Sequence, residues 1–309
     1  MFQGMEYIYE VYKEKSFSKA AANLFISQPS LSANVKRVEK RIGYPVFDRS
    51  TKPLGLTECG EKYIQAVEHI LDVQNNFENF IKDLGELKTG SLNIGGSNFF
   101  SSWVLPPLIA DFSKKYPSIK ISLVEESTSK LAHLLQTGKL DLMVDNCILD
   151  DDIFDRALYQ KEHLLLAVPK NFPVNQELKD YQISIDSIRS GQYLTEDIPA
   201  VSLAAFDDAP FIVLRPDNDT GKRALHICQE NHFSPNIVFQ IDQQMTAYNI
   251  TCSGMGVSFI GDMLLSRVPV NPELVFYRLP GKNCSRNVYF YRKKGRYLSR
   301  VMEEFLKTL

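Results

Sequence analysis

The chain has 309 residues, of which 44% are hydrophobic and 23% are charged, an ordinary composition for a globular protein of about two domains. Its 35 Lys and Arg residues nearly balance its 37 Asp and Glu residues, which excludes both a uniformly basic coat protein and a disordered acidic tail. No apolar run approaches the roughly 18 residues of a membrane span, and the N-terminus lacks the apolar core of a signal peptide, so a cytoplasmic protein with no membrane partner is expected.

The first sixty residues predict a helix-turn-helix. Apolar residues at helical spacing predict a first helix within residues 5–14. Ser18 is expected to cap a short, Ala-rich second helix, and Ser27 is expected to cap a third helix that ends at Gly43. The apolar stripe of the third helix consists of Leu31, Val35, Val38 and Ile42. Two short helices joined by a tight turn, the second with a polar outer face, are typical of this motif.

The polar outer face of the third helix is suited to reading DNA bases. Small amides and hydroxyls near the start of a recognition helix approach base edges in the major groove. This face carries Gln28, Ser30, Ser32, Asn34, Lys36 and Arg37. Residues 45–57 follow, with Pro, Gly and the basic side chains Arg49 and Lys52, and they predict a short β-hairpin wing that contacts phosphates.

Charge is distributed unevenly along the chain. Residues 1–58 contain nine basic and six acidic side chains, a net charge of +3, so the remainder carries −5 of the total of −2. The near-neutral total therefore conceals a basic head and an acidic body, and the basic head favours a nucleic-acid partner.

The same segment resembles the N-terminal module of the LysR-type transcriptional regulators. The matching marks are SFSKAA, SQPSLS, VEKRIG, VFDR and LTECG, in the family's order and spacing. The resemblance implies that bases are faced by Gln28, Pro29, Ser30, Ser32 and Asn34. It also implies that Arg49 contacts a phosphate. The other candidates for the DNA-binding surface are Ser18, Lys36, Arg37 and Lys52.

One position departs from the family pattern. After SQPSLS the family usually has Arg, whereas this chain has Ala33. An Arg–guanine pair contributes about 1–3 kcal/mol of discrimination. The preferred half-site is therefore expected to differ at that base, or to be read more through DNA shape.

Residues 59–89 predict one long helix that connects the head, residues 1–58, to the body. Thr57 is a suitable N-cap, and Glu58 and Glu61 suit the positive end of the helix. A heptad seam is formed by Tyr63, Val67, Ile70, Gln74, Phe77, Ile81 and Leu84. The narrow seam favours a dimerisation helix over a helix packed on its own body. The resemblance implies a homodimer or homotetramer, and two-fold symmetry implies a pseudo-palindromic operator.

From residue 90 to 309, strands and helices alternate, which predicts an α/β body with a mainly parallel sheet. The marks LDLMV, APFIVL, SGMGVSFIG and YRKKGRYLS resemble the two-lobed effector-binding domain of the same family, which is related in fold to periplasmic binding proteins. Lobe I is expected at about 90–166 and 267–309, and lobe II at about 167–266. Residues 177–199 fit least well and resemble an insertion.

The crevice between the lobes is the expected effector site. Ligands of open α/β sheets bind beyond the carboxyl ends of the strands, where helix N-termini favour anions. The candidate side chains are Ser97, Asn98, Ser101, Ser102, Ser127, Thr128, Asn146, Thr220, Gln243 and Met245. Each one taken alone is as well explained as a helix cap or a polar loop residue. The hydroxyl-rich strand ends favour a small anion or carboxylate as the effector.

No enzyme motif occurs: there is no GxSxG, GxxxxGK[ST], HExxH or GxGxxG after a strand. No catalytic residue, metal or cofactor is therefore predicted, and Asp150–Asp152 is read as a solvated loop. The cysteines include no CxxC pair, so reduced, mostly buried thiols are expected, with a redox-sensing cysteine as the alternative. They are Cys59, Cys147, Cys228, Cys252 and Cys284.

The sequence therefore predicts a ligand-responsive, sequence-specific bacterial transcription regulator, not an enzyme. Its expected partners are double-stranded DNA, a small-molecule effector, further copies of itself and RNA polymerase. The alternative is an α/β solute-binding protein or enzyme with an appended helical domain. That alternative predicts no salt-sensitive affinity for DNA.

Overall fold

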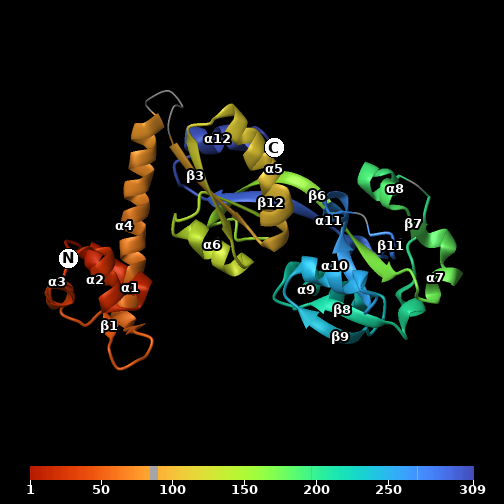
Figure 1. Ribbon diagram of the computed structural model, residues 1–309, viewed down its shortest axis with the longest axis horizontal. Helices are drawn as coiled ribbons and strands as arrows, with labels where there is room; N and C mark the ends of the chain where they lie inside the picture. Colours follow the sequence, from red (N-terminus) through yellow and green to blue (C-terminus); the bar gives the residue numbers. More distant parts are fainter. Residues whose placement is uncertain (84–89, 196, 270) are drawn as a thin grey trace. The chain divides into compact units, whose positions relative to one another are not determined.

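The computed structural model describes residues 1–83, 90–195, 197–269 and 271–309 (Figure 1). The chain forms two compact units, Met1–Ile81 with Thr137–Lys139, and Lys82–Gln136 with Leu140–Leu309. Within the described ranges, no helix is long and apolar enough to span a membrane.

The first unit is a winged helix-turn-helix followed by a long helix. Its elements are α1 (Met5–Glu14), α2 (Phe17–Asn23), α3 (Gln28–Ile42), β1 (Phe47–Asp48), β2 (Gly55–Leu56) and α4 (Glu58–Asp83). The wing is an antiparallel pair in which Phe47 faces Leu56. Of the predicted stripe of α3, Ile42 is half-buried, and the other three residues are buried together with Ile8 and Val11 of α1.

The helix caps follow local rules, with one exception. The Ser27 hydroxyl accepts from the Ser30 N–H at 3.3 Å, and Gly43 ends α3 with a φ of 88°, so both predictions are confirmed. The prediction for Ser18 is wrong, because α2 is capped by Ser16, whose hydroxyl accepts from the Lys19 N–H. An N-cap needs a non-helical backbone, which Ser16 has, whereas Ser18 lies inside the helix.

The second unit is built on one mixed sheet. The strand order is β4-β3-β5-β12-β6-β10-β8-β9, and β11 pairs with β6 and β7. The strands are β3 (Gly90–Gly96), β4 (Ile119–Glu125), β5 (Leu142–Asp145), β6 (Phe154–Pro169), β7 (Gln182–Ile183), β8 (Pro210–Leu214), β9 (Asn236–Ile241), β10 (Val257–Gly261), β11 (Leu274–Arg278) and β12 (Ser285–Lys293). The expected parallel pairing holds for β3 with β4 and β5, and for β8 with β9 and β10. The pairings of β6, β11 and β12 are antiparallel, so the prediction of a mainly parallel sheet is wrong: these strands join the two parallel halves by antiparallel pairing.

Helices flank this sheet along its length. The α-helices are α5 (Leu105–Lys115), α6 (Thr128–Gln136), α7 (Val174–Glu177), α8 (Ile185–Ser190), α9 (Asp219–Glu230), α10 (Gln244–Cys252), α11 (Asp262–Arg267) and α12 (Arg300–Leu306). The shorter turns are the π-helix η1 (Phe100–Val104) and the 3-10 helices η2 (Lys179–Tyr181), η3 (Gln192–Leu194), η4 (Leu203–Phe206) and η5 (Lys282–Cys284).

Strand β6 joins two lobes. Residues 154–163 of β6 pair with β12, and residues 164–169 pair with β10 and β11 (Figure 1). Its side chains alternate between the two faces, so Leu165 and Ala167 enter one buried cluster and Leu164 and Leu166 enter another. The long strand therefore carries the chain from lobe I, with β3, β4 and β5, to lobe II, with β8, β9 and β10.

The segment that fits the family pattern least well, residues 177–199, is part of lobe II. It contains η2, β7, α8 and η3, and β7 adds to the edge of β11. The buried Tyr193 donates its hydroxyl to Asp262 at 2.6 Å, which fixes the segment to α11.

Candidate DNA-binding surface and effector site

The recognition helix α3 presents its polar residues in two rows. Gln28, Ser32 and Lys36 recur every four residues and form one row along the helix. Ser30, Asn34 and Arg37 form the neighbouring row. Of the predicted base-facing residues, Gln28, Pro29 and Ser30 are exposed, whereas Ser32 and Asn34 are half-buried.

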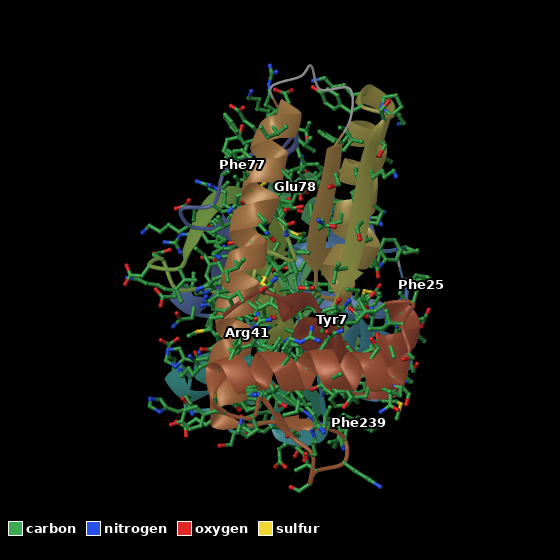
Figure 2. The ribbon with its side chains drawn as sticks, turned by 90° about the vertical axis from the view of Figure 1, so that its left-hand side faces the viewer. Tyr7, Phe25, Arg41, Phe77, Glu78 and Phe239 are labelled. Carbon is green, nitrogen blue, oxygen red and sulfur yellow. The ribbon has the colours of Figure 1, made fainter. Side chains whose placement is uncertain are left out.

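Asn34 lies beside α1. Its Oδ1 accepts from Arg37 Nη1 at 3.1 Å, and both side chains line a groove of about 200 Å³ with Tyr7 and Arg41. Asn34 is thus engaged within the head and lies on a different row from Gln28 and Ser32. Sequence reasoning also missed Phe25, which is 95% exposed in the turn before α3 (Figure 2).

The wing is tied to α3 through Glu39. The Val46 N–H donates to Glu39 Oε1 at 2.9 Å, and Arg49 Nη2 lies 3.5 Å from Glu39 Oε2. The guanidinium of Arg49 also lies 5.2 Å from the centroid of the Phe17 ring. Because a guanidinium has five donors, this anchored and partly exposed group keeps donors for another acceptor. Lys52 in the wing and Ser18 in α2 are exposed.

The predicted seam of α4 is divided between two roles. Tyr63 and Val67 are buried in the core of the head, so the first part of the seam packs within its own chain and is not available for dimerisation. Further along, Phe77 is 63% exposed (Figure 2), and three other apolar side chains are exposed on the same part of the helix. They are Val73, Phe80 and Ile81. Gln74 is exposed, and Leu84 lies outside the described residues.

An inner pocket of about 50 Å³ lies between the two lobes. Lobe I contributes Ser97, Thr128 and Asn146, and lobe II contributes Thr220 and Gln243, so five predicted residues are brought together. The pocket is also lined by residues that sequence reasoning missed: Phe99, Phe100, Asp145, Cys147, Leu214, Asp217, Asn218, Asp219 and Gln244.

The other five predicted residues do not line this pocket. The Ser101 hydroxyl is buried and donates to the Gly96 carbonyl at 2.7 Å, and Asn98 Nδ2 donates to Glu125 at 2.8 Å. Ser102 and Ser127 are exposed elsewhere, and Met245 packs against the larger core cluster. The helical turn begins directly after Ser97, and the Ser101 hydroxyl is used by the Gly96 carbonyl within this turn.

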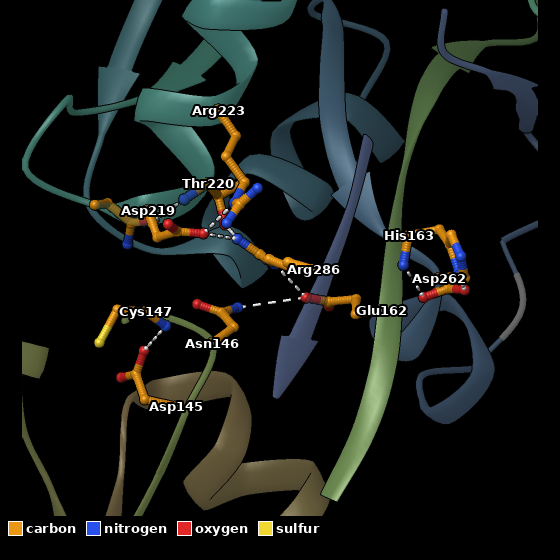
Figure 3. A network of polar contacts seen from close by, with 11 residues as sticks. Asp145, Asn146, Cys147, Glu162, His163, Asp219, Thr220, Arg223, Asp262 and Arg286 are labelled. Atoms are coloured by element: carbon orange, nitrogen blue, oxygen red, sulfur yellow. Dashed lines mark hydrogen bonds and ion pairs between the residues drawn. The ribbon is translucent and has the colours of Figure 1, made fainter. Parts of the chain in front are cut away.

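A buried charged network crosses the crevice (Figure 3). Arg286 of β12 lies 2.6 Å from Glu162 of β6 through its Nε, and its Nη1 lies 2.8 Å from Asp219 Oδ2. The same Nη1 donates to the Thr220 hydroxyl at 2.9 Å, and Asn146 Nδ2 donates to Glu162 at 3.4 Å. Asn146 comes from lobe I and Thr220 from lobe II, so the network connects both lobes through the crossing strands.

Electrostatics favour an ionised arginine in this network. Burial by itself lowers the pKa of Arg286, but the carboxylates of Glu162 and Asp219 outweigh burial and raise that pKa above its usual value. In contrast, burial raises the pKa of Asp145, although hydrogen bonds from Cys147 N–H and Thr128 Oγ1 at 2.9 and 2.8 Å oppose the shift.

The thiols near and beyond the pocket are poor redox sensors. Burial, followed by the charge of Asp145, raises the pKa of Cys147 far above its usual value. Burial also raises the pKa of Cys228 to about 12 and that of Cys284 to about 11. Because the thiolate is the reactive form, these three groups lack the low pKa of a sensor.

Two known protein families match nearly the whole chain between them. Residues 2–61 match the bacterial regulatory helix-turn-helix protein, lysR family, and residues 85–309 match the LysR substrate binding domain. The chain belongs to the LysR family. The LysR-type resemblance seen in the sequence motifs is thereby confirmed, together with the fold class of a helix-turn-helix head and an α/β effector domain.

Relatives of this LysR-family protein align over its full length. The HTH-type transcriptional regulator YcgK of Bacillus subtilis (strain 168) is 28% identical over 311 residues, covering 98% of this chain and 92% of the relative. The structure of a full-length OxyR variant from Pseudomonas aeruginosa has a TM-score of 0.72 at 19% identity, covering 99% of this chain and 93% of that chain. Full-length CbnR complexed with its target DNA has a TM-score of 0.64 at 16% identity, covering 99% and 98%. The protein is thus a DNA-binding transcriptional regulator with an effector-binding domain.

Proposed function

We propose that this LysR-family protein binds a pseudo-palindromic operator as a homodimer or homotetramer and regulates transcription in the cytoplasm. The observation that carries the proposal is the exposed, polar start of α3 on a head with a net charge of +3. Gln28, Pro29 and Ser30 are accessible to base edges. Lys36, Arg37, Arg49 and Lys52 supply the positive charge for phosphates.

Self-association is supported by the exposed apolar stripe of α4. Val73, Phe77 and Ile81 recur at i, i+4 and i+8, which gives the distal part of α4 one apolar side. A stripe of this kind exposed to water favours a partner with the same surface. A two-fold pairing of such helices carries two heads to two half-sites.

The effector acts, in this proposal, by shifting the balance between two arrangements of the lobes. The inner pocket and the Arg286 network both draw residues from lobe I and lobe II. A ligand that contacts both lobes binds one arrangement more tightly and raises its population. The heads then change their engagement of DNA and of RNA polymerase, so the protein acts by binding, without catalysis.

Footprinting on the DNA upstream of the protein's own gene, repeated over a range of salt concentrations, tests this function. We expect a protected, two-fold symmetric site and an affinity that falls steeply with salt. A protein that protects no site and has salt-insensitive affinity is not a sequence-specific regulator.

A further inference from the structure

The inner pocket is acidic, in contrast to the anion site expected from the sequence. Its lining includes the carboxylates of Asp145, Asp217 and Asp219, and it includes no Lys or Arg among the described residues. The buried cation Arg286, which is not in the lining, is engaged by Glu162 and Asp219 through its Nε and Nη1, while its Nη2 has no partner among the described residues. The lining itself therefore offers an anionic ligand carboxylates and no cation.

Two of the helix N-termini at this pocket lie beside the chain's own carboxylates. Thr128, the first residue of α6, donates its hydroxyl to Asp145 at 2.8 Å. Asp219 is the first residue of the twelve-residue helix α9. A carboxylate of the chain thus lies near each of these two helix N-termini, where it opposes a further anion, whereas Gln243 at the start of α10 makes no side-chain cap hydrogen bond.

Two buried side chains of the pocket lining retain hydrogen-bonding capacity. Asp145 is only 2% exposed and accepts from Thr128 and Cys147, and a carboxylate has lone pairs for further donors. Gln244 also lines the pocket, and its buried Nε2 has no acceptor within the described part of the chain. An occupant that supplies a positively charged donor and an oxygen acceptor satisfies both.

The size of the pocket limits what enters it. A volume of about 50 Å³ holds a small polar group and not a whole metabolite. A larger outer pocket of about 700 Å³ shares Asp217, Asn218 and Asp219 with it and is also lined by Lys222 and Arg223. The remainder of a ligand, including an acidic end, fits there.

We propose that the effector is a small primary amine whose ammonium group, with an adjacent oxygen, enters the inner pocket between Asp145, Asp219 and Gln244. This assignment rests on the proposed function, in which the interlobe crevice is the effector site. It excludes simple carboxylates that lack an amine.

Matched pairs of ligands test the proposal on the full-length protein by calorimetry and thermal shift. Ethanolamine is compared with 3-hydroxypropanoate, and isoserine (3-amino-2-hydroxypropanoate) with malate, since each pair exchanges an ammonium for a carboxylate and keeps the neighbouring hydroxyl. We expect the amines to bind and raise the melting temperature, and the acids to do neither. Tighter binding of the acids, or no binding of either amine, overturns the proposal.

Variants locate the binding. Asp145→Asn should weaken both amines by about tenfold or more, whereas the exposed control Asp208→Asn should leave their affinity unchanged. If Asp145→Asn does not fold, Gln244→Leu serves instead. It should weaken ethanolamine and not ethylamine, which lacks the oxygen. Unchanged affinity for ethanolamine in the folded variants refutes the assignment.

The ligand class and the regulator function can fail separately. If the amines do not bind while the protein still protects its DNA site, only the ligand class is wrong. If the protein protects no DNA site, the regulator function itself is refuted.

Discussion

Arg286 and Glu162 are direct cross-strand partners in the antiparallel pairing of β12 with β6, and their side chains meet at 2.6 Å. Both side chains are 1% exposed. The pair lies at the end of the β12 ladder, next to the residues of β6 that begin pairing with β10. A buried ion pair thus lies at the boundary between the two lobes.

Breaking this pair should destabilise the body. Arg286→Met leaves Glu162 buried without its cation, which typically costs about 3–5 kcal/mol of unfolding free energy, whereas Asp219 keeps its ion pair with Arg223. The double variant Arg286→Met/Glu162→Gln should recover part of the loss, as measured by urea unfolding of the full chain. The control Lys114→Met removes an exposed pair with Asp111 and should change nothing measurable. A single variant as stable as the wild type contradicts the role given to Arg286.

Asp145 should make stability fall as pH rises. Because burial raises the pKa of Asp145 in the folded state, its contribution is present below the usual Asp pKa of about 4 and is lost as pH rises through the higher folded value. Asp145→Asn removes this loss of unfolding free energy, which is about 1.4 kcal/mol for each unit by which folding raises the pKa. The variant should therefore exceed the wild type in stability at pH 7, and the difference should vanish near pH 4. Asp208→Asn is the control, and a difference that grows on acidification contradicts the sign.

The distal part of α4 should control self-association. Phe77→Ser removes one large apolar side chain from each copy, at about 1.5–3 kcal/mol each. In a dimer the two losses should raise the dissociation constant by on the order of 100-fold or more, measured by sedimentation equilibrium. Asn75→Ser, a change on the same exposed segment, should leave the constant unchanged. Equal behaviour of the two variants would place the interface elsewhere.

Base reading and phosphate binding should separate in two variants of the head. Gln28→Ala should reduce the binding free energy for the operator by about 1–3 kcal/mol and change that for random DNA little. Lys52→Ala should weaken both DNAs alike and reduce the salt slope by about 0.9. Binding isotherms at several salt concentrations measure both effects. If Gln28→Ala lowers the affinity for operator DNA and for random DNA equally, Gln28 does not read bases.

Local patterns predicted the head well. Ser27, Gly43 and the α3 stripe act within one or two helical turns, so their effects can be read from sequence spacing. The heptad of α4 shows where this reasoning ends. Tyr63 and Phe77 occupy equivalent seam positions, yet Tyr63 is buried in the head and Phe77 is exposed. Spacing identifies an apolar face but not what covers it.

The sequence by itself determined the family, the recognition helix and the strand ends where polar groups gather, because these depend on short-range periodicity and motif order. Only the tertiary structure decided the charge of the inner pocket. Arg286 lies 124 positions from Glu162 and 67 from Asp219, and the pairing of β12 with β6 brings them together. Whether a buried cation is free for a ligand or neutralised by the chain's own carboxylates is set by distances of a few ångströms, since the interaction falls with separation and strengthens away from water. Those distances belong to the fold.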